Sequence, residues 1–132
     1  MKKILTLVCC TILLAATSCT KKYVTPGAKT IFTNVTADMW QVDNSSDPGS
    51  VHGLTVDVPV QDITNYYDDN GAVLVYIDNG NGFYEQIPNV YGNVTLRVTY
   101  YTAGHIFIDA QTSNGAIPTN PGPLHLKIVL VP

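Results

Sequence analysis

Apolar and polar residues alternate along much of the chain beyond residue 28, in short runs separated by turn-forming residues. The clearest alternation is in residues 94–100, where apolar residues occupy every even position and Thr95, Arg97 and Thr99 lie between them. Successive side chains of a β-strand point to opposite faces of its sheet. The pattern therefore predicts a strand with residues 94, 96, 98 and 100 on a buried face, as antiparallel sandwiches require.

Eight runs of this kind are rich in Val, Ile, Thr, Tyr and Phe and are bounded by Asn-Gly, Asp-Asn and Pro-Gly turn signals. Short strands at this spacing favour a sandwich over a barrel. We expect an all-β fold, an antiparallel β-sandwich of about seven to eight short strands over residues 29–132. The predicted strands are Thr30–Val35, Met39–Asp43, Val51–Val58, Ala72–Asp78, Gly82–Ile87, Val94–Tyr101, His105–Gln111 and Leu124–Val131.

Three segments have a more specific local prediction. The Asn-Gly pairs in Asp78–Gly82 tolerate the positive φ that tight hairpin loops need, so the strands on either side of them should pair. Ala72–Ile77 is apolar throughout, which predicts a strand inside its sheet. Gln61–Asn70 is the one segment where a helix is expected, about two turns long and with Asp62 as its N-cap.

The first eighteen residues read as an export signal. Met1–Lys3 carry positive charge, and the apolar run Ile4–Ala16 is shorter than the roughly 20 residues that a membrane-spanning helix needs. We therefore expect residues 1–18 to be removed and to take no part in the fold.

The end of this segment, Leu14–Cys19, resembles a bacterial lipobox, with small residues just before the cysteine. The resemblance implies cleavage after Ser18 and attachment of a diacylglycerol to the Cys19 thiol, which would anchor the chain stably. Cys9 and Cys10 leave with the signal, so Cys19 would have no disulfide partner, as suits a lipidated residue. Ala16 stands where lipoboxes prefer Leu, so cleavage by an ordinary signal peptidase is the alternative.

Residues 19–28 contain Lys, Thr, Pro and Gly without periodicity and are expected to form a tether. No Asp follows Cys19, which by resemblance to enterobacterial sorting rules favours the outer membrane. No acidic stretch follows it either, as one often does in surface-exported lipoproteins. The expected location is thus the outer membrane, with the domain facing the periplasm rather than the cell surface.

Composition changes this picture in one respect. Apolar residues make up 45% of the chain and charged residues 13%, which indicates a folded core. Without Lys2 and Lys3 the chain holds 5 basic and 10 acidic side chains. An acidic surface with scattered lysines offers no stripe to neutralise phosphates, so nucleic acid is not an expected partner.

Metal binding has two weak candidates. Asp43, Asp47, Asp68 and Asp69 lie in segments rich in oxygen donors, the ligands that calcium prefers, although Asp and Asn also simply form turns. The first segment begins like an EF-hand loop but has Leu54 at its twelfth position instead of Glu. The three histidines, His52, His105 and His125, are far apart in sequence, and solvent-facing strand positions are expected for them rather than zinc ligation.

Catalysis has no clear sequence signature, and neither a cofactor nor enzymatic activity is expected. Glu85 is the single glutamate, and no serine stands in a Gly-x-Ser-x-Gly turn. Exposed aromatic residues on a sandwich can stack on sugars or anchor a protein interface, although tyrosine is also an ordinary strand former. Tyr66, Tyr67, Phe83 and Tyr84 lie beside predicted loops and are the candidate ligand contacts.

Several motifs beyond Trp40 carry a resemblance: Asp69–Tyr76, Asn79–Gly82, Ile87-Pro88, Tyr91-Gly92 and Leu126–Val131. With these motifs the chain is similar to small lipoproteins of the Bacteroidota that have no assigned activity. The similarity runs from about Trp40 to the C-terminus and implies a fold and a source rather than any functional residue.

Three functions remain open from the sequence. The first is a non-catalytic binding or structural module at the bacterial envelope, with an envelope protein or a glycan as its partner. The second is a carbohydrate-binding accessory module, with or without the assistance of calcium. A small hydrolase is the third and least favoured.

Overall fold

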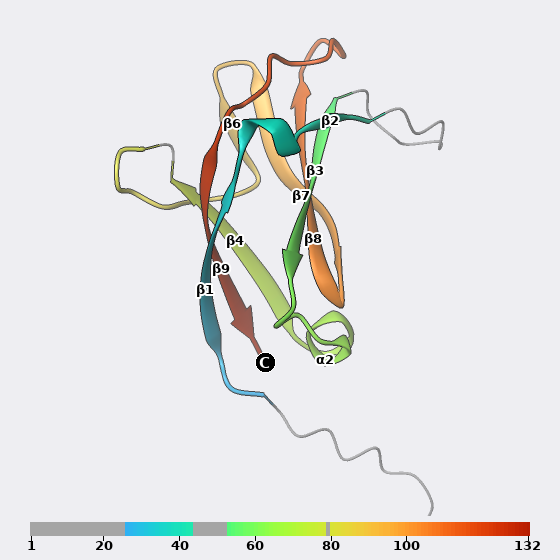
Figure 1. Ribbon diagram of the computed structural model, residues 1–132, viewed down its shortest axis with the longest axis vertical. Helices are drawn as coiled ribbons and strands as arrows, with labels where there is room; N and C mark the ends of the chain where they lie inside the picture. Colours follow the sequence, from blue (N-terminus) through green and yellow to red (C-terminus); the bar gives the residue numbers. More distant parts are fainter. Residues whose placement is uncertain (1–25, 44–52, 79) are drawn as a thin grey trace, which may run out of the picture.

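The computed structural model describes residues 26–43, 53–78 and 80–132, which form two antiparallel β-sheets packed face to face (Figure 1). The predicted all-β sandwich is confirmed. The described residues form nine strands rather than seven to eight. Sheet A holds, in spatial order, β1 (Lys29–Val35), β9 (Leu124–Val131), β4 (Ala72–Asp78) and β5 (Glu85–Gln86). Sheet B holds β2 (Gln41–Val42), β3 (Leu54–Val60), β8 (Gly104–Thr112), β7 (Val94–Thr102) and β6 (Asn89–Tyr91).

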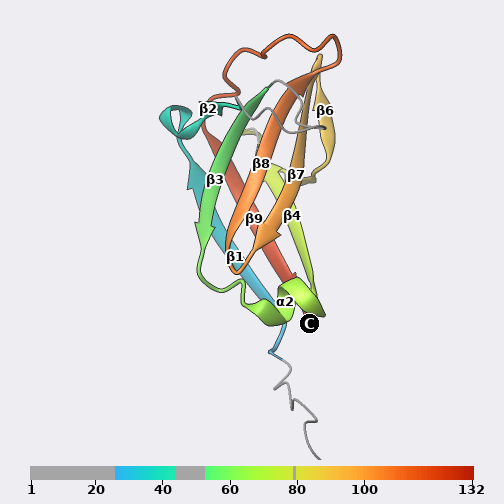
Figure 2. The ribbon, with the colours of Figure 1, turned by 90° about the vertical axis from the view of Figure 1, so that its right-hand side faces the viewer.

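The chain passes between the two sheets four times. A 3₁₀ turn, η1 (Ala37–Met39), leads from β1 to β2, and the short helix α2 (Asn65–Asp69) leads from β3 to β4. β5 is followed by β6 in the other sheet, and residues 113–123 return the chain from β8 to β9. In Figure 2, β3, β8 and β7 lie in front of β1, β9 and β4, and α2 closes one end of the sandwich. We call this end the α2 pole.

The core lies between the sheets and follows directly from the alternation in the sequence. Every second residue of β9, from Leu124 to Leu130, is buried, and the same holds for β3 from Leu54 to Val60. Ile106 and Ile108 of β8 are fully buried. Because apolar surface removed from water contributes about 25 cal/mol per Å², these inward faces supply most of the driving force for folding.

A bulge in β7 changes the alternation that the sequence predicts. Val98 lies opposite Ile108, but the next pair is Tyr100 with Phe107, so Thr99 is an extra residue in the strand. An extra residue shifts the phase of the side chains that follow it. Tyr101 consequently lies opposite the buried Ile106 and packs against the core. Beyond Thr99 the strand is therefore offset by one residue from the alternation predicted for residues 94–100.

The shortest strands are where the sequence prediction was least accurate. β2 and β5 have two residues each, because η1 takes up the start of the predicted Met39–Asp43 and the loop takes up the start of the predicted Gly82–Ile87. β6 was not predicted at all. β4 and β9 have the predicted bounds. β4 lies inside sheet A as expected, although two-residue β5 is its neighbour on one side.

The β4–β5 connection pairs the two strands as predicted, with Ile77 opposite Glu85, but its loop is longer than a tight turn. The Asp78 carboxylate accepts hydrogen bonds from the backbone N–H groups of Gly80, Asn81 and Gly82, at 2.8 to 3.0 Å. Both glycines have positive φ, which other residues rarely adopt. These bonds give the loop a defined shape and delay the start of β5 to Glu85.

The core predicts a clear contrast between two positions in sheet B. Ile108→Ala should lower the free energy of unfolding by about 2 to 5 kcal/mol, because a fully buried side chain is replaced by a cavity. Val90→Ala should change it by no more than about 0.5 kcal/mol, because Val90 is 59% exposed. Urea denaturation monitored by fluorescence measures both. Equal losses in the two variants would contradict the assignment of the inward face.

Candidate functional site

The outer face of sheet A brings aromatic side chains and one lysine together. Phe32 on β1 lies directly opposite Lys127 on β9, and Lys127 in turn lies opposite Tyr76 on β4. Directly opposed residues of paired strands point to the same face. Because Leu126 and Ile128 on either side of Lys127 are buried in the core, this row of three faces outward.

The β4–β5 loop adds the ring of Tyr84 to this row, and Phe83 precedes Tyr84 in the chain. The ring of Tyr84 lies 6.0 Å from that of Phe32, centroid to centroid, at an interplanar angle of 60°. The Nζ atom of Lys127 lies 5.5 Å from the ring centroid of Tyr76 and 5.9 Å from that of Tyr84, within the range of cation–π attraction. We call Phe32, Tyr76, Tyr84 and Lys127, together with Phe83 beside Tyr84 in the chain, the aromatic platform.

The aromatic platform is unusually exposed for its composition. Phe32 is 64% exposed, Phe83 73% and Tyr84 39%. Single exposed apolar residues are common on protein surfaces, but adjacent ones from separate segments form a patch, and such patches mark interaction sites. The platform combines residues from β1, β4, β9 and the β4–β5 loop, so it exists only in the folded domain.

Lys127 differs from the other basic residues that the structure describes. Lys29 pairs with Asp62, and Arg97 lies 3.6 Å from Asp109. Among the described residues, no carboxylate lies within 4 Å of the Lys127 ammonium, and its neighbours are aromatic rings. The platform therefore presents a positive charge that is not neutralised by an ion pair within the described part of the domain.

A polar row borders the platform on one side. His125 and Asn34 lie opposite each other on β9 and β1, two residues away from Lys127 and Phe32 respectively. The His125 Nδ1 atom lies 2.7 Å from the Asn34 Oδ1 atom, so the imidazole N–H donates to the amide oxygen. Both residues are exposed, and their remaining polar atoms face solvent beside the platform.

The four predicted ligand contacts divide between the two ends of the domain. Phe83 and Tyr84 belong to the platform, as their position beside a loop suggested. Tyr66 and Tyr67 lie in α2 instead, and their rings contact each other edge to face. Tyr67 was expected to be a surface contact, but it is 3% exposed and is therefore a core residue.

The remaining platform residues were not predicted from the sequence. Tyr76 is 44 residues after Phe32 and 51 residues before Lys127, and no local motif joins the three. The available signal was the alternation of β1 and β9, which places Phe32 and Lys127 at outward positions. Only the pairing of β9 between β1 and β4 brings them together.

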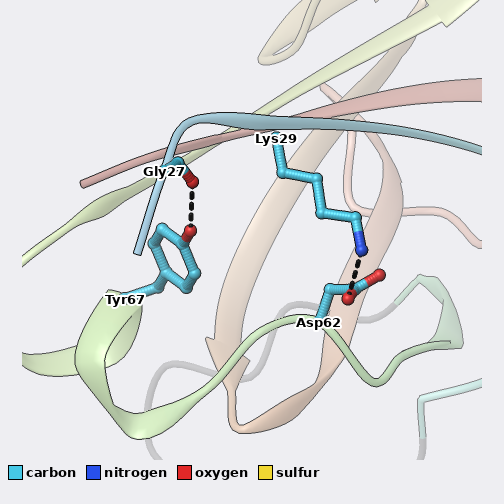
Figure 3. Close-up of polar contacts among 4 residues, drawn as sticks. All are labelled: Gly27, Lys29, Asp62 and Tyr67. Carbon is cyan, nitrogen blue, oxygen red and sulfur yellow. Dashed lines mark hydrogen bonds and ion pairs between the residues drawn. The ribbon is translucent and has the colours of Figure 1, made fainter. Parts of the chain in front are cut away.

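The segment that leads into β1 is held at the α2 pole by two polar contacts (Figure 3). The Tyr67 hydroxyl donates to the backbone oxygen of Gly27 at 2.9 Å, and the Lys29 ammonium pairs with the Asp62 carboxylate. Asp62 was expected to cap the helix, but Thr64 holds the N-cap position. The domain is thus entered from the pole that also holds the C-terminus (Figure 1).

The metal candidates do not come together in the described residues. Asp68 and Asp69 lie in α2, whereas Asp43 follows β2 at the opposite end of the sandwich (Figure 1). His105 and His125 are exposed strand residues, as expected, but they lie on different sheets. No group of three or more His, Cys, Asp or Glu side chains suited to a metal is present in residues 26–43, 53–78 and 80–132. Asp47, His52 and Cys19 lie outside the described residues.

Two hollows accompany the platform elsewhere on the domain. One, of about 380 Å³, is lined by apolar side chains of β6, β7, β9 and Pro121. The other, of about 440 Å³, lies over the outer face of sheet B and includes Asp57, whose carboxylate is 2.8 Å from His105 Nδ1. In the first hollow, the Tyr91 hydroxyl donates a hydrogen bond to the Glu85 carboxylate at 2.7 Å.

One carboxylate has a shifted acidity. A hydrogen bond from the Thr36 hydroxyl, and to a lesser extent one from a backbone N–H group, lowers the pKa of Asp38. The carboxylate is therefore charged at neutral pH, where it accepts these bonds in the η1 turn. A general acid needs a raised pKa instead. Asp38 therefore serves the local structure.

Comparison of the chain with protein-family models, with curated proteins and with solved structures gave no match. None of the helices in the described part is long and apolar enough to cross a membrane.

The contact between α2 and the entering segment predicts a small stability effect. Tyr67→Phe keeps the buried ring and removes the hydroxyl that binds Gly27, so the free energy of unfolding should fall by about 0.5 to 1.5 kcal/mol. Tyr84→Phe removes a hydroxyl from a partly exposed ring and should change it by less than about 0.5 kcal/mol. Urea midpoints compare the two, and an unchanged midpoint for Tyr67→Phe would show that the bond does not stabilise the fold.

Proposed function

We propose that this protein is a non-catalytic binding module, held at the bacterial envelope by a lipid on Cys19, and that it binds its partner through the aromatic platform. The observation that carries the proposal is the exposure of Phe32 and Tyr84 beside Lys127 on the outer face of sheet A, with the exposed Phe83 next to Tyr84 in the chain. Aromatic rings contribute large contact areas at low entropic cost, which is why they dominate binding surfaces.

The energetics of the platform support a role in binding rather than in folding. Phe32 and Phe83 leave most of their apolar surface in water, so they contribute little to the stability of the free domain. A ligand that covers these rings would remove their apolar surface from water, and this burial would contribute to the free energy of binding. The edge contacts between Phe32, Tyr84 and Lys127 orient the rings before binding, which reduces the entropy lost on association.

The way the chain enters the domain is compatible with a membrane tether. The nine residues from Cys19 to Gly27 are joined by eight peptide units, which span at most about 29 Å when fully extended. The α2 pole, which receives the tether, would be the part of the domain nearest the membrane. The platform lies along the side of the sandwich, where a partner could reach it without displacing the tether.

The anchor is tested by metabolic labelling with an alkyne analogue of palmitate in a bacterial host. The wild-type chain should take up the label and fractionate with membranes, whereas Cys19→Ala should take up none, because the acceptor thiol is gone. Cys10→Ala is the matched control and should be labelled normally, because this cysteine lies in the predicted signal. Label in Cys19→Ala, or none in the wild type, would contradict lipidation at Cys19.

The platform is tested by a thermal-shift panel of neutral and acidic oligosaccharides, peptidoglycan fragments, acidic peptides, and calcium against a chelator. A ligand that binds the folded state alone raises the melting temperature. Phe32→Ala should abolish the shift that the wild type shows, yet lower the free energy of unfolding by less than about 1 kcal/mol, because the ring is exposed.

Val90→Ala, on an exposed position of sheet B, is the control and should keep the ligand-induced shift. A shift of the same size in Phe32→Ala would place the binding site elsewhere on the domain. A stability loss above about 2 kcal/mol in Phe32→Ala would show that the ring belongs to the core.

A further inference from the structure

We infer that the ligand of the aromatic platform is a glycan whose pyranose rings carry a carboxylate, as uronic acids do. This inference rests on the proposed function, since it names the chemistry that the same surface recognises. Three features of the platform carry it: the unpaired charge of Lys127, the exposed rings beside it, and the polar row formed by Asn34 and His125.

The charge of Lys127 points to an anionic ligand. The described residues hold nine acidic and three basic side chains, and both other basic residues are paired with carboxylates. In such an acidic domain, an ammonium group without a carboxylate partner is conspicuous. A ligand carboxylate beside it would form a charge-assisted hydrogen bond that no group in the described part of the domain supplies.

The rings point to a ligand with a flat apolar face. The ring planes of Phe32 and Tyr84 are tilted by 60° with centroids 6.0 Å apart, so the two rings do not form one flat surface. The C–H face of a pyranose ring can stack on one of these aromatic rings while its edge contacts the other. Lys127 lies next to both rings, at the place where a carboxylate on the stacked sugar would project.

The polar row supplies the contacts that hydroxyl groups need. The bond between His125 Nδ1 and Asn34 Oδ1 uses neither the Asn34 amino group nor the other imidazole nitrogen, and both side chains are exposed. These two groups are one row away from Lys127 and Phe32 on the same face. Sugar hydroxyls both donate and accept, so they match a donor and a ring nitrogen side by side.

The size and surroundings of the platform favour a short oligosaccharide over a protein. A stable protein interface covers about 800 Å² on each partner, whereas the platform consists of four rings and one lysine and is bordered by polar residues. The acidic side chains of the domain, among them Asp78 opposite His125 in the polar row, would repel a long polyanion within the Debye length of about 8 Å. A few acidic sugar units fit these limits.

The test is isothermal titration calorimetry of the full chain in mild detergent micelles with trigalacturonic acid, its methyl ester and triglutamate. The methyl ester keeps the rings and hydroxyl groups and removes the charges. The wild type should bind the acid at least about five-fold more tightly than the ester, because the ester cannot form the charge pair with the Lys127 ammonium. Triglutamate, which has carboxylates but no sugar rings, should bind more weakly than trigalacturonic acid.

Variants of the lysines assign the effect to one position. Lys127→Met keeps much of the apolar stem and should bind acid and ester equally, and Lys127→Arg should restore the preference for the acid. Lys29→Met removes the same charge from the α2 pole, away from the platform, and should keep the preference. A preference that survives in Lys127→Met, or disappears in Lys29→Met, would overturn the assignment to Lys127.

The outcomes separate this inference from the proposed function. If the ester binds as tightly as the acid, or triglutamate binds better than both, and the binding disappears in Phe32→Ala, the platform binds a ligand but the acidic glycan is the wrong class. If none of the three probes binds, the acidic glycan is likewise overturned, and the thermal-shift panel then decides the platform. If probes bind equally to Phe32→Ala and the wild type, both proposals fail.

Discussion

The register of β9 is the constraint on which the rest of the structure depends. This strand lies between β1 and β4 and pairs with both over their full lengths. Its even-numbered residues from Leu124 to Leu130 face the core, and Lys127 lies between them on the outside. A shift of one residue would exchange the two faces, exposing four buried leucine and isoleucine side chains and burying a charge without a partner. The hydrophobic core and the aromatic platform are therefore fixed by the same pairing.

This coupling explains how a surface can be organised by residues that are distant in sequence. β1 and β9 come from opposite ends of the domain, and β4 comes from its middle. The core selects the register, and the register then sets which outward residues become neighbours. Phe32, Lys127 and Tyr76 lie in one row because Ile31, Leu126 and Ile77 each meet the core beside them. The loop from β4 to β5 completes the row with Tyr84.

The same argument shows what sequence reasoning could and could not predict. Period-two alternation marks strands such as β4 and β9 correctly, because their burial is decided locally by which side chains are apolar. It does not reveal the bulge at Thr99 in β7, since the extra residue is visible only against the pairing with β8. It also makes β2 and β5 too long and misses β6, because the two or three residues of these strands depend on partners rather than on their own pattern.

The candidate contacts likewise divide into residues that local sequence can indicate and residues that only the pairing of strands brings together. A loop signal beside Phe83 and Tyr84 made them candidates, and both are exposed. The same signal made Tyr67 a candidate, but a loop signal does not report burial, and Tyr67 is buried. Phe32 and Lys127 could not be found without the order of strands in sheet A. Strand order is a property of the whole chain, so it has no local sequence signature.

The two outer faces of the sandwich differ in how they treat charge, and this difference favours the face of sheet A as the binding surface. On sheet B, Asp109 is 8% exposed and lies beside Arg97, while Asp57 lies beside His105, so each of these charged groups has a partner on its own face. On sheet A, Lys127 meets aromatic rings instead. Pairing within a face reduces what its charges can offer to a ligand, because a partner must first be displaced. The face that leaves a cation beside exposed rings keeps both the charge and the apolar area available for binding.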